Sequence, residues 1–288
     1  MLSVRPGQSA SDSVYKFSTY QYLLDIYPNA AVAYSLRKLR SVYSGSAVRI
    51  RRSGDNAETD IGFTALNNFD TASAEAFCIA GGGTQNGYVT TFYDQSGNSK
   101  NATNATASQQ PIIVSSGAVV TTGSKPTVQF DGSDDFLSAS YRATTQIITV
   151  LGVQQFLTTA NNQVGITVSE ISSGQIYFGY ITSGATSYTY EDTQSKTRTN
   201  TTNRQLVTLA IGGANGNWYV NGSGSGFTPD NTITQITQTS GQDLRLGGYS
   251  GGGFNANINI QEFIIFQIDQ SANITGLELN INTYYGIY

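Results

Sequence analysis

From residue 126 to the C-terminus, turn residues divide the sequence into short runs of β-favouring residues. Runs such as "ITVLGVQQF" and "FIIF" alternate with Gly, Asn and Ser at a spacing typical of a β-sandwich. Within "NWYVNGSGSG", Asn221-Gly222 is the strongest hairpin signal. Charged residues are only 12% of the chain, which disfavours a helical bundle. We expect strands at 126–130, 136–140, 146–156, 163–169, 174–182, 186–191, 204–212, 216–221, 232–237, 242–247 and 257–267.

Three stretches favour helices instead. Residues 29–45 carry apolar residues at three- and four-residue spacing after Asn29, which can cap a helix. Residues 70–80 predict a second, short helix that Asp70 would cap. The final "SANITGLELNINTYYGIY" has apolar residues at helical spacing and predicts a short closing helix.

The chain has no histidine and a single cysteine, Cys78. The lack of histidine excludes Ser-His-Asp and Cys-His catalysis and any histidine-ligated metal, and one cysteine cannot form an intrachain disulfide. We expect Cys78 to be a small buried residue, because its neighbours are mostly apolar. The net charge of −4 disfavours nucleic acid as a partner.

The N-terminal "MLSVRPGQSASDSVYKF" has no apolar core of signal-peptide length, and no segment is long enough to span a membrane. We therefore expect synthesis in a cytoplasm without a signal peptide, and no insertion into a membrane.

Three blocks in order carry a family resemblance: "AYSLRKLRSVYSGSAVRIRRSGDNAETDIGF", "TTFYDQSGNSKNAT" and "KPTVQFDGSDDFL". They resemble the catalytic domain of the B-type fungal α-L-arabinofuranosidases, glycoside hydrolase family fifty-four. The same blocks are similar to the opening of many phage-encoded proteins. From "VQFDGSDDFL" through "WYVNG" to "FIIF", the chain resembles concanavalin A-like (laminin-G-like) sandwiches. The resemblance implies a mainly β fold, an antiparallel jelly-roll sandwich with a small helix-containing N-terminal elaboration.

This resemblance also implies a division of the chain into three parts. Residues 1–30 are expected to form an arm or adaptor, residues 31–125 the elaboration packed on the sandwich, and residues 126–288 the sandwich itself.

Family fifty-four enzymes need two carboxylates, so the resemblance identifies where these groups should stand. The family's acid/base aspartate follows a Gly-Gly pair, and the position after that pair in "RLGGYSGGG" holds Tyr249. The nucleophile position falls on Gly174 or Gln175. Glu170 is near, but four or five residues along a strand would place it more than about 10 Å away. The resemblance therefore implies a site without catalytic residues, and no cofactor is expected.

Aromatic residues are the best candidate ligand surface, because sugar rings stack on aromatic faces while neutral polar groups supply hydrogen bonds. We expect Trp218 to fill the core and Tyr249, in its glycine-rich loop, to be exposed. The candidate carbohydrate-binding residues are Tyr249, Tyr177, Tyr180, Tyr188, Tyr190 and Gln175.

Two charged clusters have a functional and a structural interpretation. Asp131, Asp134 and Asp135 offer oxygen ligands suited to calcium, but their spacing favours a polar turn. A group of basic residues could bind phosphate or an acidic glycan, but we favour ion pairs that tie the N-terminal part to the sandwich. That group is Arg37, Lys38, Arg40, Arg49, Arg51 and Arg52, with Asp55, Glu58, Asp60 and Asp94 as expected partners. Asp94 itself is expected to form a turn.

These observations favour a non-catalytic phage virion protein, either a capsid decoration or fibre or a tail adhesin, that binds cell-surface carbohydrate. Residues 1–30 would contact other virion proteins, the chain would be made in the host cytoplasm, and a homo-oligomer would multiply weak sugar contacts. One alternative is a purely structural virion component. Another is an active arabinofuranosidase-like hydrolase with displaced carboxylates among Glu170, Glu191, Asp192, Asp243 and Glu262.

Overall fold

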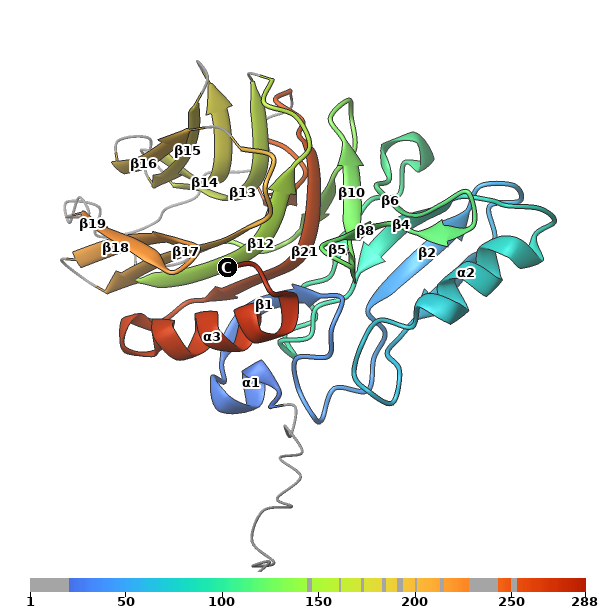
Figure 1. Cartoon of the computed structure of the whole chain (residues 1–288), viewed down its shortest axis with the longest axis horizontal. Coiled ribbons are helices and arrows are strands. Elements are labelled where there is room, and N and C mark those ends of the chain that lie inside the picture. The colour runs from blue at the N-terminus through green and yellow to red at the C-terminus, as the bar shows by residue number, and fades with distance from the viewer. Residues whose placement is uncertain are drawn as a thin grey trace, which may run out of the picture.

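The fold is built from two layers of antiparallel strands with helices packed outside them (Figure 1). The computed structural model describes residues 21–288 except 144–146, 161, 172–173, 183–184, 191–193, 200, 213–214, 228–242 and 250–252. This architecture confirms the mainly β sandwich that the sequence predicts.

One layer contains β1 (Ala30–Ser35), β21 (Asn257–Phe266), β12 (Ile148–Phe156), β17 (Gln205–Gly212), β18 (Asn215–Val220) and β19 (Ser223–Phe227), paired in that order. The strand β10 (Val128–Asp131) also pairs with β21. The other layer contains β4 (Gly87–Phe92), β5 (Ala102–Thr103), β11 (Leu137–Ala139), β20 (Leu244–Leu246), β13 (Gln163–Ile171), β14 (Gly174–Thr182), β15 (Ala185–Tyr190) and β16 (Gln194–Thr199).

Shorter strands extend the second layer beyond β4. They are β2 (Val48–Arg52), β3 (Glu58–Ile61), β6 (Ile112–Ser115), β7 (Ala118–Val119) and the small ladder of β8 (Thr121–Thr122) with β9 (Lys125–Pro126). The helices are α1 (Leu23–Ile26), α2 (Thr71–Ala80) and α3 (Ile274–Tyr285). In Figure 1, α2 lies against β2 and β4, and α3 lies below β12, β17 and β21.

The first layer is buried on both of its faces. Val150 of β12 belongs to the core between the layers, whereas its neighbour Leu151 packs with Leu277 and Ile281 of α3. A strand covered on both faces needs apolar residues at successive positions, which explains the unbroken runs in β12 and β21.

Several local predictions are confirmed. Asp70 caps α2 by accepting a 3.1 Å hydrogen bond from the Ser73 amide. The closing helix is α3, and Asn221 and Gly222 form the β18–β19 turn with positive φ values of 51° and 77°. The expected strand at 232–237 lies outside the described residues.

The helix predicted for residues 29–45 is wrong. Its first part is the strand β1, which pairs with β21 at the edge of the first layer. Val32 and Tyr34 join the core between the layers, and Ala33 joins the cluster under α3. Burial of both strand faces produces an apolar run that periodicity alone cannot distinguish from a helix.

No helix in the described part of the chain is both long and apolar enough to cross a membrane.

Candidate functional site

The outward face of the second layer is defined by two neighbouring residues of β14. The ring of Phe178 points into the core, with its centroid 5.3 Å from that of Trp218 and 5.8 Å from that of Phe263. Successive side chains on a strand point to opposite faces, so Tyr177 lies on the outer face. The prediction that Trp218 fills the core is confirmed, since its side chain is 1% exposed.

A row of polar residues continues across this outer face from Tyr177. Thr167 of β13 is the cross-strand partner of Tyr177, Arg245 of β20 is the partner of Thr167, and Ser138 of β11 is the partner of Arg245. Residues directly opposite each other share a face, so these four residues form one continuous row. Ser138, Arg245 and Tyr177 are half-buried and offer a hydroxyl, a guanidinium and an aromatic ring, whereas Thr167 is fully buried.

The glycine-rich loop after β20 places Tyr249 beside this row. The Gly247 amide donates to the Gly165 carbonyl oxygen at 2.8 Å, and Thr167 Oγ1 donates to the Gly248 carbonyl oxygen at 3.0 Å. Gly247 has φ 88°, and a Cβ there would overlap the Phe130 ring, so only glycine fits. These contacts fix the backbone on which Tyr249 stands.

Tyr249 lies between two other aromatic rings. Its ring centroid is 6.2 Å from that of Tyr177 and 6.1 Å from that of Phe254, both in edge-to-face geometry. The Phe254 carbonyl oxygen accepts a 2.8 Å bond from the Val164 amide, and its side chain is 42% exposed. We call Tyr177, Tyr249 and Phe254 the aromatic trio.

Arg245 brings a cation to the same face. Its guanidinium carbon lies 3.8 Å from the Phe136 ring centroid, and Nη2 donates to Asn255 Oδ1 at 3.2 Å. Burial lowers the pKa of Arg245, and its buried Nε has no hydrogen-bond partner among the described residues. Aromatic rings beside a half-buried guanidinium match the apolar and polar groups that a sugar ring requires.

The structure brings two of the six predicted ligand residues, Tyr249 and Tyr177, into contact. For the others only the backbone register is described: Gln175 is opposite Glu170, Tyr180 opposite Val164, Tyr188 opposite Phe178 and Tyr190 opposite Gln194. Phe254 and Arg245 were not predicted. Phe254 directly follows the glycines at 251–253, in the same glycine-rich loop as Tyr249. This position in the loop is the sequence signal that could have identified Phe254.

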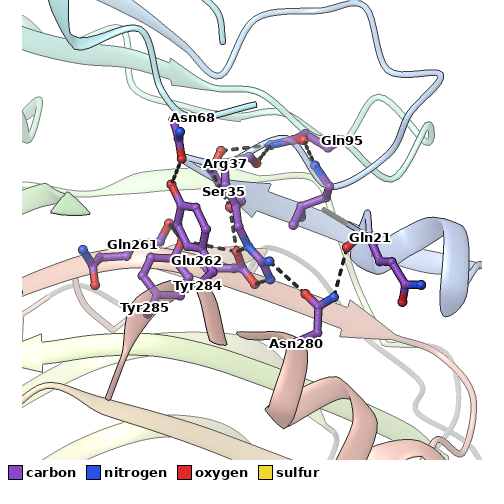
Figure 2. A network of polar contacts seen from close by, with 11 residues as sticks. Gln21, Ser35, Arg37, Asn68, Gln95, Gln261, Glu262, Asn280, Tyr284 and Tyr285 are labelled. Carbon is purple, nitrogen blue, oxygen red and sulfur yellow. Dashed lines mark hydrogen bonds and ion pairs between the residues drawn. The ribbon is translucent and has the colours of Figure 1, made fainter. Parts of the chain in front are cut away.

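Glu262, one of the candidate displaced carboxylates, forms a buried ion pair with Arg37 (Figure 2). Arg37 Nε donates to Glu262 Oε2 at 2.7 Å and Nη2 donates to Oε1 at 2.9 Å, while both side chains are 1% exposed. Ser35 Oγ and the Tyr285 hydroxyl donate to the same Oε2 at 2.7 and 3.2 Å. A carboxylate with these partners and no solvent access is structural.

Two further predictions about carboxylates have different outcomes. Asp243 pairs with Arg142 at 3.1 Å, and residues 191–193 lie outside the described residues. The expectation that Glu170 lies far from Gln175 is wrong, because β13 and β14 form a hairpin in which the two residues are direct cross-strand partners. Such partners have Cα atoms about 4.5–5.5 Å apart.

The three aspartates form a compact group at the β10–β11 turn. Their oxygens lie within 4.8 Å of one another. Asp131 Oδ1 accepts from the Ser133 amide at 2.7 Å, and Asp135 Oδ2 accepts from the Asp131 amide at 3.0 Å, which are the contacts of a polar turn. Burial, with Asp131 and Asp134 nearby, raises the pKa of Asp135 to about 7. The group can hold a cation only if its acids ionise.

The basic residues pair only partly as expected. Arg49 contacts Glu58 at 2.8 Å and Asp60 at 3.7 Å, and Arg52 contacts Asp55 at 2.6 Å. The other basic residues have different partners: Arg37 pairs with Glu262, Arg40 donates to a carbonyl oxygen of the Ser96 backbone, and Arg51 donates to Gln110 and Asn56.

Asp94 is the turn-former that the sequence predicts. Its buried carboxylate accepts from the Ala33, Ser96 and Lys100 amides at 2.9–3.0 Å and from Ser96 Oγ at 2.7 Å. Cys78 is fully buried, as predicted.

The sequence matches no protein-family model and no curated protein. Among solved structures, the fold is similar to an arabinofuranosidase complexed with arabinofuranosyl-α-1,2-xylobiose, with 17% identity and a TM-score of 0.68. It is also similar to a GH54 α-L-arabinofuranosidase soaked with a cyclic sulfate inhibitor, with 17% identity and a TM-score of 0.65. Each match covers 91% of this chain and 64% of the other. The likeness establishes a shared β-sandwich fold.

Proposed function

We propose that the protein is a non-catalytic carbohydrate-binding sandwich whose ligand lies across the outer face of β13, β14 and β20. The observation that carries this proposal is the aromatic trio, with Tyr249 between Tyr177 and Phe254. Sugar rings stack on aromatic faces, which the exposed Phe254 and the half-buried Tyr177 and Tyr249 can offer. The neighbouring Arg245 and Ser138 can hydrogen-bond sugar hydroxyls. An arabinose-containing glycan is the first ligand to test, because a structurally similar arabinofuranosidase has been solved in complex with arabinofuranosyl-α-1,2-xylobiose.

Substitution of Tyr249 tests the proposal. Tyr249→Ala should weaken binding of an arabinoxylan oligosaccharide at least about tenfold, as expected for an aromatic anchor. Tyr249→Phe retains the ring and should retain most of the affinity. Tyr88→Ala, which removes a half-buried tyrosine of β4, is the matched control and should leave binding unchanged. Equal affinity in Tyr249→Ala and the parent would reject the proposed face.

A place on a phage virion is the second part of the proposal, and it is supported by the sequence resemblance to phage-encoded proteins. The protein would then be displayed on the capsid or tail, with residues 1–30 contacting other virion proteins and with several copies acting together. Deletion of residues 1–20, which leaves α1 and β1 intact, should remove the protein from purified particles and leave glycan binding unchanged. Particles that retain the shortened protein would contradict this attachment.

A hydrolase is the second candidate function, and the register of Glu170 favours it. The hairpin makes Glu170 the cross-strand partner of Gln175, two residues along β14 from Tyr177. A retaining glycosidase needs a second carboxylate as well, and Tyr249 occupies the position where the family resemblance expects the acid. Hydrolysis of 4-nitrophenyl α-L-arabinofuranoside that is abolished in Glu170→Gln and unaffected in Asp243→Asn would establish this alternative.

A further inference from the structure

A second concave site lies beside α1 and β1. In Figure 1, these two elements lie below the sandwich, on the other side from β13 and β14. Its volume is about 320 Å³, and its walls include Pro28, Asn29, Arg40, Ser96 and Asn98. This volume is at the small end of the roughly 300–1,000 Å³ typical of small-molecule sites, so it suits a single sugar-sized ring.

The wall formed by residues 94–98 is held rigidly. Asn98 Nδ2 donates to the Ala30 and Ala31 carbonyl oxygens at 2.9 and 3.0 Å. Ser96 Oγ accepts from the Asn98 amide at 3.2 Å and donates to Asp94, whose carboxylate accepts four hydrogen bonds in all. The site is therefore formed before any ligand arrives, which lowers the entropic cost of binding.

Arg40 is the charged residue of these walls. Its Nη1 donates to the Ser96 carbonyl oxygen at 2.6 Å, which fixes the guanidinium while Nε and Nη2 have no partner among the described residues. Two acids of the surrounding segments have other partners: Asp25 accepts from the Ser41 amide, and Asp94 accepts from the Ser96 amide and hydroxyl. Arg40 forms no ion pair with any described carboxylate.

Asn98 supplies the complementary group. Both hydrogens of its amide nitrogen are used by β1, so Oδ1 remains available as an acceptor. A ligand that fits must therefore present an anion to the Arg40 fork and a hydroxyl to Asn98. A carboxylate matches a guanidinium in a bidentate manner.

We propose that this pocket binds a hydroxylated carboxylate of monosaccharide size, that is, a sugar acid such as a hexuronate. The site uses elements different from those of the aromatic trio, so it stands whether or not the proposed function is correct. Acetate lacks a hydroxyl that could donate to Asn98 Oδ1, and neutral sugars lack the anionic group that Arg40 binds.

Titration of the full chain with D-galacturonate tests this assignment, using calorimetry and the amide NMR signals of Ala31 and Ser96. We expect binding with a dissociation constant in roughly the millimolar range or below, and much weaker binding of D-galactose and of acetate. Arg40→Gln should weaken galacturonate binding at least about tenfold. Arg142→Gln removes the same charge from an exposed pair and should change nothing.

A second variant keeps the test decisive if Arg40→Gln fails to fold. Asn29 lines the pocket at φ 68°, a conformation that aspartate also tolerates, so Asn29→Asp adds a negative charge without backbone strain. It should weaken galacturonate binding and leave thermal stability unchanged. The proposal is overturned if galactose or acetate binds as tightly as galacturonate, or if neither Arg40→Gln nor Asn29→Asp weakens binding.

Discussion

Arg37 and Glu262 form a two-pronged ion pair that is completely enclosed by the fold, with N–O distances of 2.7 and 2.9 Å. Arg37 belongs to the segment after β1 and Glu262 to the middle of β21, 225 residues later. Arg37 Nη1 also donates to Asn280 Oδ1 of α3 at 2.8 Å (Figure 2). The pair thus joins the edge strand, the central strand and the closing helix.

Breaking this pair from one side should be costly. Arg37→Met leaves the Glu262 carboxylate buried without its cation, and we expect the free energy of unfolding to fall by about 3–5 kcal/mol. The double variant Arg37→Met/Glu262→Met should recover much of that loss, because no uncompensated charge remains. Denaturant unfolding of the two variants measures the difference. Equal destabilisation by single and double variants would show that the charge imbalance is not the cause.

Substitution of Gly247 by alanine should destabilise the fold more than the same substitution of Gly253, which lies in the same loop. Both residues have positive φ values, 88° and 72°, so alanine costs roughly 1–2 kcal/mol at either position. At Gly247 the added methyl also overlaps the Phe130 ring, while at Gly253 it meets nothing within 4 Å. Gly247→Ala should therefore cost about 1–3 kcal/mol more than Gly253→Ala in denaturant unfolding. Similar losses would contradict the packing around Gly247.

The pKa of Asp135, raised to about 7 from 3.8, predicts a pH dependence of stability. The folded state holds this proton more tightly than the unfolded state, so the stabilisation is complete below about pH 4 and is lost as the pH rises through 7. Asp135→Asn should reduce the fall in the free energy of unfolding between about pH 4 and pH 7. Chemical denaturation at intervals across this range measures the effect, and a variant with the same slope as the parent would contradict it.

Calcium tests the same aspartate group. The contacts of Asp131 and Asp135 are those of a turn, so we expect added calcium at pH 8 to leave the melting temperature unchanged. A concentration-dependent rise that Asp134→Asn abolishes would instead identify a calcium site.

The sequence predicted the strands of the sandwich well, because alternating residues and turn signals act locally. It failed for β1, whose two buried faces give an apolar run that resembles a helix. The predicted separation of Glu170 from Gln175 was also wrong. That prediction assumed that both residues lie on one extended strand, whereas they lie on the two strands of a hairpin and are direct partners. The predicted boundary at residue 125 remains a prediction.

The candidate site was predictable only in part. Tyr249 was found because the family resemblance places a site residue directly after the Gly-Gly pair, and because a glycine-rich loop favours exposure. Arg245 reaches the outer face beside Thr167 and Tyr177 through strand pairing, and Phe254 reaches Tyr249 through the loop geometry. Such contacts between distant residues depend on register, which no local pattern in this sequence specifies.

The most direct test of the central claim is one titration of the protein with an arabinoxylan oligosaccharide, followed by NMR and by chromatography of the sugar. Carbohydrate binding without catalysis predicts saturable changes in the signals of Tyr177, Tyr249 and Phe254, and an oligosaccharide recovered intact. Release of arabinose would contradict the absence of catalysis, and unchanged signals from these three residues would contradict the site.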